Sequence, residues 1–135
     1  MTSMIETFAR LHIPGNPLVL FNIWDAGSAK AVAEAGAQAI ATGSYGVAEA
    51  QGFKDGEAFT LDLALTNLER IVGVTDLPVT LDMESGYGAT AEDVGRSVAA
   101  ARAAGAVGIN LEDRMPGIAE LTPVGEQARR IAAAA

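Results

Sequence analysis

The stretch Leu81-Asp82-Met83-Glu84-Ser85-Gly86-Tyr87-Gly88 decides the interpretation of this sequence. It follows the β-rich run Pro78-Val79-Thr80 and precedes a predicted helix that begins after Thr90. Because side chains alternate between the two faces of a strand, we expect Asp82 and Glu84 to point the same way at the strand's carboxyl end. Two aligned carboxylates before a flexible Gly-x-Gly turn suit a divalent cation such as Mg²⁺, which takes oxygen ligands.

A second acidic strand end, Asn110-Leu111-Glu112-Asp113, follows one strand–helix unit later. Each acid taken singly is better explained as a solvated loop residue. Asp82, Glu84 and Glu112 converging on adjacent parallel strands would repel one another and raise at least one pKa, and a hard cation relieves that repulsion. The recurrence therefore favours a cation site.

Length and composition limit the classes of protein that fit. The chain has 135 residues, which predicts one domain over residues 1–135, and half of them are hydrophobic, which argues against disorder. The net charge of −8 argues against nucleic acid as a partner, and the absence of cysteine excludes disulfides and thiol nucleophiles within the chain. We find no signal-peptide pattern and no apolar run long enough to span a membrane, so we expect a cytoplasmic protein without a membrane partner.

Apolar runs alternate with segments of helical periodicity, which predicts a βα repeat. The expected helices lie at 3–11, at 28–35, from residue 60, from residue 90 and from residue 122 with Pro123 as first helical residue; the expected strands lie at 18–21, 39–42, 79–83 and 107–111.

Strands that alternate with helices form parallel sheets, and two architectures fit this order: an open doubly wound sheet, or the first half of a (β/α)₈ barrel. The run Arg129–Ala135 reads as helix without a C-terminal capping signal: either the helix frays at a terminus or the chain is a piece of a longer one, and the uncapped helix favours half a barrel. In both architectures ligands bind at the carboxyl ends of the strands.

Three further segments fall at this edge. Trp24 and Asp25 follow the first strand, where Trp24 fits the core and Asp25 fits a helix cap as well as either fits a ligand site. The loop Gly43-Ser44-Tyr45-Gly46 is rich in backbone N–H groups able to hold a carboxylate, although an ordinary turn fits it better. Lys54-Asp55-Gly56 lies in a long connection that fits either a lid or a surface loop.

Five motifs in order resemble the isocitrate lyase/phosphoenolpyruvate mutase superfamily, from about residue 18 to the end of the chain. They are Asn22-Ile23-Trp24-Asp25-Ala26-Gly27-Ser28-Ala29, Thr42-Gly43-Ser44-Tyr45-Gly46-Val47-Ala48, Gly52-Phe53-Lys54-Asp55-Gly56, Asp82-Met83-Glu84-Ser85-Gly86-Tyr87-Gly88 and Gly105-Ala106-Val107-Gly108-Ile109-Asn110-Leu111-Glu112-Asp113.

The resemblance implies a (β/α)₈ barrel of about twice this length, of which this chain matches the first half, and a homo-oligomer. By resemblance, Asp82, Glu84 and Glu112 form the Mg²⁺ site, and Trp24 and Asp25 belong to the substrate and metal surroundings. The backbone of Ser44, Tyr45 and Gly46 cradles a substrate carboxylate, and Asp55 matches the mobile-loop aspartate of the mutases; Asp25 and Asp55 are the catalytic candidates. The metal would polarise a small 2-oxo acid or phosphonate and stabilise an enolate as a C–C or C–P bond breaks.

One segment departs from the family pattern. Lyases with tricarboxylate substrates carry a cysteine motif after the fourth strand, whereas this chain has Arg114-Met115-Pro116-Gly117 there. The mutases' lysine and asparagine are not evident either. We therefore expect a Mg²⁺-dependent lyase or mutase of another substrate. The alternatives are a non-catalytic half-barrel that persists by self-association, and an open sheet that binds a ligand without chemistry.

Overall fold

The computed structural model describes residues 3–135. Its strands are β1 (Asn22–Ile23), β2 (Ile40–Thr42), β3 (Val79–Asp82) and β4 (Gly108–Asn110). Its helices are α1 (Met4–Arg10), α2 (Ala26–Glu34), α3 (Ser44–Ala50), α4 (Leu61–Val72), α5 (Ala91–Ala103) and α6 (Val124–Ala134).

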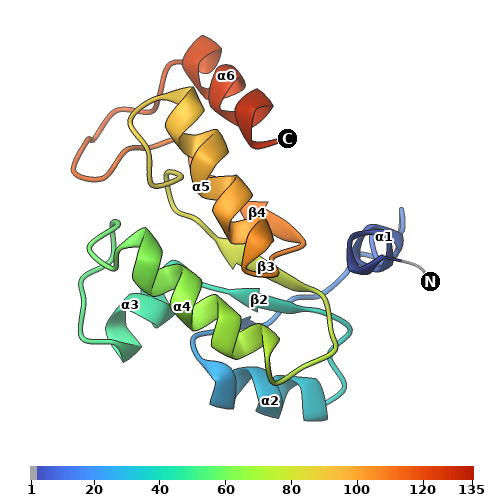
Figure 1. The fold of residues 1–135 in the computed structure, drawn as a ribbon. Coiled ribbons are helices and arrows are strands. Elements are labelled where there is room, and N and C mark those ends of the chain that lie inside the picture. Colours follow the sequence, from blue (N-terminus) through green and yellow to red (C-terminus); the bar gives the residue numbers. More distant parts are fainter. Residues whose placement is uncertain (1–2) are drawn as a thin grey trace.

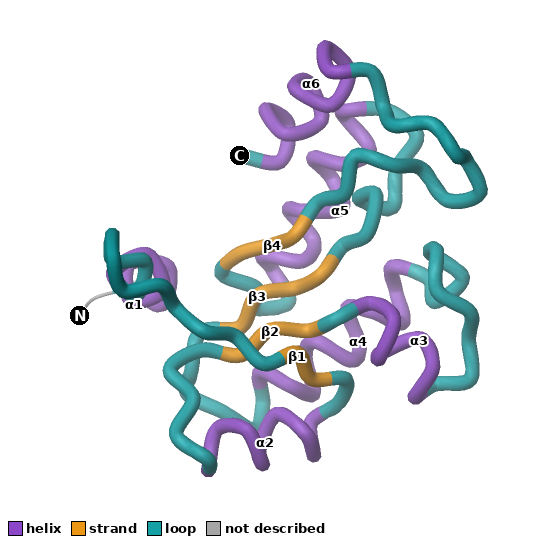
Figure 2. The backbone as a smooth tube through the Cα atoms, turned by 180° about the vertical axis from the view of Figure 1, so that it is seen from behind, coloured by secondary structure: helices purple, strands orange, loops and turns teal. Residues whose placement is uncertain are grey.

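The four strands form one parallel sheet in the sequential order β1-β2-β3-β4. Helices α2, α4 and α5 lie on one face of this sheet, as the front and back views show (Figures 1 and 2). A doubly wound sheet reverses its strand order and carries helices on both faces. Sequential order with helices on one face is the arrangement of a barrel wall, which confirms the first half of a (β/α)₈ barrel as the fold class.

The core lies between the sheet and its helices. Leu68 and Ile71 from α4 are fully buried and pack with Ile40, Val79 and Leu81 from the strands. Leu65 and Leu61, one and two turns before Leu68, pack partly buried against the same cluster. The apolar stripe predicted for this helix is therefore the face that fixes it on the sheet.

The predicted position of the first strand is wrong. Residues 18–21 form no strand, and β1 instead pairs with β2 through Asn22 and Ile23. Val19 and Phe21 are 66% and 63% exposed. Apolar character alone cannot make a strand where the backbone has no partner on either side, and β1 is the edge of the sheet in the described residues.

The two terminal helices differ in how they pack. The expected helix at 3–11 is present as α1, closed by a capping box between Ser3 and Glu6, and the Phe8 ring lies against Gly108 at the start of β4. Helix α6 packs along α5, and it begins after Pro123, which is its N-cap rather than its first helical residue. Among the helices of residues 3–135, none combines the length and the apolar character needed to cross a membrane.

Candidate active site

Asp82 is the last residue of β3 and lies at the carboxyl edge of the sheet, in register with Asn110. Its backbone N–H donates to Thr42 Oγ1 of β2 at 2.9 Å, and its Oδ2 accepts from the backbone N–H of Ser44 at 2.9 Å. These contacts join the end of β3 to the end of β2. The carboxylate is therefore held in one orientation at the mouth of the half-barrel.

Glu84 lies beyond the end of the strand, and this differs from the sequence-based expectation. Its φ of 49° is left-handed, so the alternation of a strand does not set its direction. The side chain is nevertheless 5% exposed, and Glu84 Oε2 accepts from the backbone N–H of Glu57 at 2.7 Å. A turn and a contact from a distant loop, rather than strand geometry, bring this carboxylate beside Asp82.

Asp55 and Glu112 complete a group of four carboxylates. Burial, followed by the charge of Asp55, raises the pKa of Glu84, against an opposing hydrogen bond from the Glu57 N–H. Burial, followed by the charges of Asp82 and Asp55, raises the pKa of Glu112. Asp55, Glu84 and Glu112 line one open depression of about 420 Å³ together with Arg114. The charge of Asp55 thus acts on both Glu84 and Glu112, and the charge of Asp82 acts on Glu112.

The chemistry of this group fits a hard divalent cation. Its members are carboxylates that repel one another, and a bound cation would lower the raised pKa values of Glu84 and Glu112. Within residues 3–135, no three acidic or histidine side chains are gathered closely enough to form a complete ligand set by themselves. Mg²⁺ commonly takes one or two carboxylates and keeps several waters, so the donors present suit it.

A second depression, of about 360 Å³, has Asp82 in its lining. Trp24, 45% exposed, and the segment Gly43–Gly46 line it. The predicted loop Gly43–Gly46 is in fact the start of helix α3, with Gly43 as its N-cap. The N–H of Ser44 points to Asp82, so the predicted cradle of Ser44, Tyr45 and Gly46 lies directly next to the acidic group.

Asp25 caps helix α2. Its Oδ1 accepts from the Ser28 backbone N–H at 2.7 Å and from Ser28 Oγ at 2.8 Å, which closes a capping box. These hydrogen bonds lower the pKa of Asp25. The capping role considered for Asp25 is therefore confirmed, while a part in catalysis stays a prediction.

The sequence analysis assigned no role in the site to Glu57, Ser85 or Tyr87, which the structure joins by hydrogen bonds. Glu57 Oε1 accepts from Ser85 Oγ and, at 3.0 Å, from the backbone N–H of Tyr87. Burial and the nearby charges of Glu84 and Glu57 raise the pKa of Tyr87, whose hydroxyl lies 3.5 Å from Glu84 Oε1. An acid two residues after Asp55 was the only available signal for Glu57.

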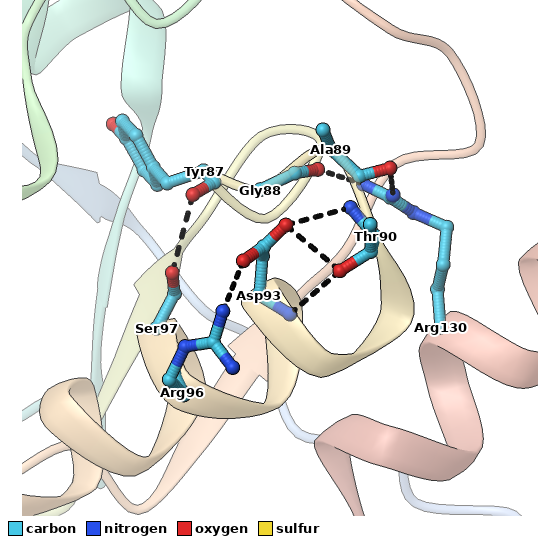
Figure 3. Close-up of polar contacts among 8 residues, drawn as sticks. All are labelled: Tyr87, Gly88, Ala89, Thr90, Asp93, Arg96, Ser97 and Arg130. Carbon is cyan, nitrogen blue, oxygen red and sulfur yellow. Dashed lines mark hydrogen bonds and ion pairs between the residues drawn. The ribbon is translucent and has the colours of Figure 1, made fainter.

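Helix α6 donates hydrogen bonds to the backbone at both acidic strand ends. The Arg130 side chain is 1% exposed and donates to the carbonyls of Ser85 at 2.6 Å, Gly88 at 3.0 Å and Ala89 at 3.3 Å. Figure 3 shows this guanidinium reaching the turn that precedes the Thr90–Asp93 capping box. Gln127, one turn earlier, donates to the carbonyl of Glu112 at 3.1 Å.

The fold and its acidic strand ends define a βα-barrel protein whose ligand site lies at the mouth of the sheet. The family model for phosphoenolpyruvate phosphomutase matches residues 8–135. 2-Methylisocitrate lyase from Escherichia coli (strain K12) is 36% identical over 116 residues, which cover 78% of this chain and 39% of that protein. The chain belongs to the isocitrate lyase/phosphoenolpyruvate mutase superfamily, as its motifs indicated.

Crystal structures of relatives agree over nearly the whole chain. A Burkholderia cenocepacia J2315 protein provisionally described as a phosphonomutase is 54% identical with a TM-score of 0.95, over 98% of this chain and 52% of that one. A second protein of this organism, provisionally described as a lyase/mutase, is 35% identical with a TM-score of 0.88, over 98% of this chain and 48% of that one. The chain thus spans about two fifths of the curated relative and about half of each crystallised chain.

Proposed function

We propose that the protein is a Mg²⁺-dependent enzyme that cleaves or rearranges a C–C or C–P bond of a small 2-oxo acid or phosphonate. The observation that carries this proposal is the set of acids after neighbouring strands, Asp82, Glu84 and Glu112, with Asp55 of the α3–α4 connection lining the same depression as Glu84 and Glu112. Membership of a superfamily of lyases and mutases gives that acidic site its chemistry. Residues 1–135 are then the first half of the catalytic barrel.

Asp82, Glu84 and Glu112 would hold the cation, directly or through water. When bound, Mg²⁺ supplies positive charge that stabilises an enolate oxygen. The N–H of Ser44 orients the Asp82 carboxylate, while Thr42 Oγ1 accepts from the Asp82 backbone N–H, and the N–H of Glu57 orients the Glu84 carboxylate. The amides at the start of α3, beside Asp82, are the proposed seat of the substrate carboxylate, with Trp24 as the adjoining wall.

Asp55 is the proposed proton-transfer group, because it lies in the depression that also contains Glu84 and Glu112. Asp25 is a weaker candidate, since its Oδ1 is engaged by Ser28 as a helix cap.

The segment after β4 limits the substrate. The chain contains no cysteine, so it lacks the acid/base thiol that tricarboxylate lyases carry after the fourth strand. We therefore propose a smaller substrate than isocitrate or methylisocitrate. Arg114, which lines the depression beside Glu112, offers a positive charge for a carboxylate or phosphonate group.

The test is a turnover assay with oxaloacetate, phosphonopyruvate and methylisocitrate, with and without Mg²⁺. The proposal predicts Mg²⁺-dependent turnover of one of the first two, lost in Asp82→Asn and retained in Asp62→Asn, an exposed acid on α4. Equal activity of the two variants, or turnover that survives chelation of Mg²⁺, would contradict it.

A second candidate is a non-catalytic half-barrel that persists by self-association. The observation that favours it is the set of exposed apolar side chains near both ends of the wall: Val19, Phe21, Leu121 and Val124, each at least 63% exposed. Light scattering separates the candidates together with the assay. A homo-oligomer with Mg²⁺-dependent turnover supports the enzyme, and a stable oligomer without turnover supports the half-barrel.

A further inference from the structure

Glu57 joins the connection between α3 and α4 to the acidic strand end. Its Oε1 accepts from Ser85 Oγ and from the Tyr87 N–H, while its own N–H donates to Glu84 Oε2. Together with a backbone hydrogen bond from Gly56 to the Glu84 carboxylate, these hydrogen bonds tie residues 54–58 to the end of β3. Removing the Glu57 carboxylate would therefore loosen this part of the connection.

The backbone around the Glu57 hydrogen bonds is left-handed at three non-glycine residues. Among residues 3–135, the non-glycine residues with left-handed φ are Glu57 at 60°, Glu84 at 49° and Tyr87 at 51°. All three belong to this one hydrogen-bonded group. Conformations of this kind persist only where the surrounding contacts impose them, and they concentrate at functional sites.

Two carboxylates depend on this arrangement. Glu84 has its Oε2 fixed by the Glu57 N–H, and Asp55 lies two residues before Glu57 in the same turn. We infer that Glu57 is a positioning residue, which holds the turn that bears Asp55 against Ser85 and Tyr87 and thereby orients Glu84. This inference deepens the proposed function and rests on it only where it concerns Mg²⁺.

Proteolysis with endoproteinase Lys-C tests the inference without metal or substrate. The sequence contains two lysines, Lys54 in the exposed turn and Lys30 in helix α2. Cleavage at Lys54 reports release of the turn, and cleavage at Lys30 reports unfolding of the helix layer. Both rates are measured on the full chain by mass spectrometry.

Glu57→Ala is expected to accelerate cleavage at Lys54 about tenfold or more, because two hydrogen bonds are lost, and to leave the Lys30 rate unchanged. Glu57→Gln keeps an Oε1 acceptor and is expected to restore the slow rate. Glu49→Ala, an exposed acid on α3, is the matched control and should cleave like the parent protein. An unchanged Lys54 rate in Glu57→Ala, a Gln variant as fast as Ala, or a parallel rise at Lys30 would each overturn the inference.

Lys-C cleavage in the presence of Mg²⁺ tests the proposed metal site separately from the role of Glu57. If Glu84 holds the cation, Mg²⁺ should slow Lys54 cleavage in the parent protein, since binding and turn closure are coupled in both directions. It should protect Glu57→Gln in the same way and Glu57→Ala less. Absence of protection in the parent protein would contradict the Mg²⁺ site, whereas the metal-free rates alone decide the role of Glu57.

Discussion

Replacement of Arg130 by methionine removes the contact through which α6 supports the turn after β3. The guanidinium donates to the carbonyls of Ser85, Gly88 and Ala89, and the side chain is 1% exposed (Figure 3). Hydrogen bonds from a charged donor contribute about 1.5–3 kcal/mol each, but burying the charge costs several kcal/mol. Because Arg130→Met leaves three carbonyls without this donor, we expect a net loss of about 3 kcal/mol in the free energy of unfolding.

Thermal unfolding followed by circular dichroism measures this loss. With about 2.1 cal/mol/K of unfolding entropy per residue over 135 residues, about 3 kcal/mol corresponds to a fall of about 10 °C in Tm. The matched control is Arg129→Met, which removes an exposed arginine paired with Glu126 on the same helix. Exposed pairs contribute about 0–1 kcal/mol, so the control should lose at most about 3 °C. Equal shifts for the two variants would refute the role given to Arg130.

Two other predictions concern helix ends and helix packing. Asp25→Ala should lower the free energy of unfolding at neutral pH by about 1 kcal/mol, because the cap to Ser28 is lost. The pKa of Asp25 is lowered in the folded protein, so its charge stabilises the folded state. The loss of unfolding free energy in Asp25→Ala should therefore be complete above the ordinary pKa of aspartate and should shrink as the pH falls through the lowered pKa of the folded state. Urea unfolding at several pH values measures this dependence. Gly95→Ala places a Cβ 2.9 Å from the carbonyl oxygen of Ala133 and should cost about 1–3 kcal/mol. Gly125→Ala, in α6 with no atom within 4 Å of the new Cβ, should be neutral or stabilising, and a similar loss for both glycine variants in thermal unfolding would contradict the close α5–α6 packing.

Local signals predicted the inner strands and the described helices other than α3. The helix expected after Thr90 is α5, and the structure shows a capping box between Thr90 and Asp93. The apolar run that became β3 pairs on both sides, so its sequence and its environment agree. The run at 18–21 looks equally apolar, but β1 lies at the edge of the described sheet and that run forms no strand. Pairing partners, which a single run cannot reveal, decided the difference.

The site could be predicted in its residue types but not in its geometry. Parallel strand ends meet at one edge, and this brought Asp82 and Glu112 together as expected. The Glu84 carboxylate accepts from the backbone N–H of Glu57, which is 27 residues away in the sequence, and its backbone is left-handed. Arg130 reaches Ser85 across 45 residues, and a helix sequence rich in alanine gives no sign that this arginine is buried.

Calorimetric titration with oxalate, an enolate mimic, is the decisive measurement for the proposed Mg²⁺ site at the acidic strand ends. If these carboxylates hold Mg²⁺ for enolate chemistry, oxalate binding should require Mg²⁺, disappear in Asp82→Ala and be retained in Asp62→Ala. Failure of oxalate to bind in the presence of Mg²⁺, or binding unchanged by Asp82→Ala, would rule out such a site.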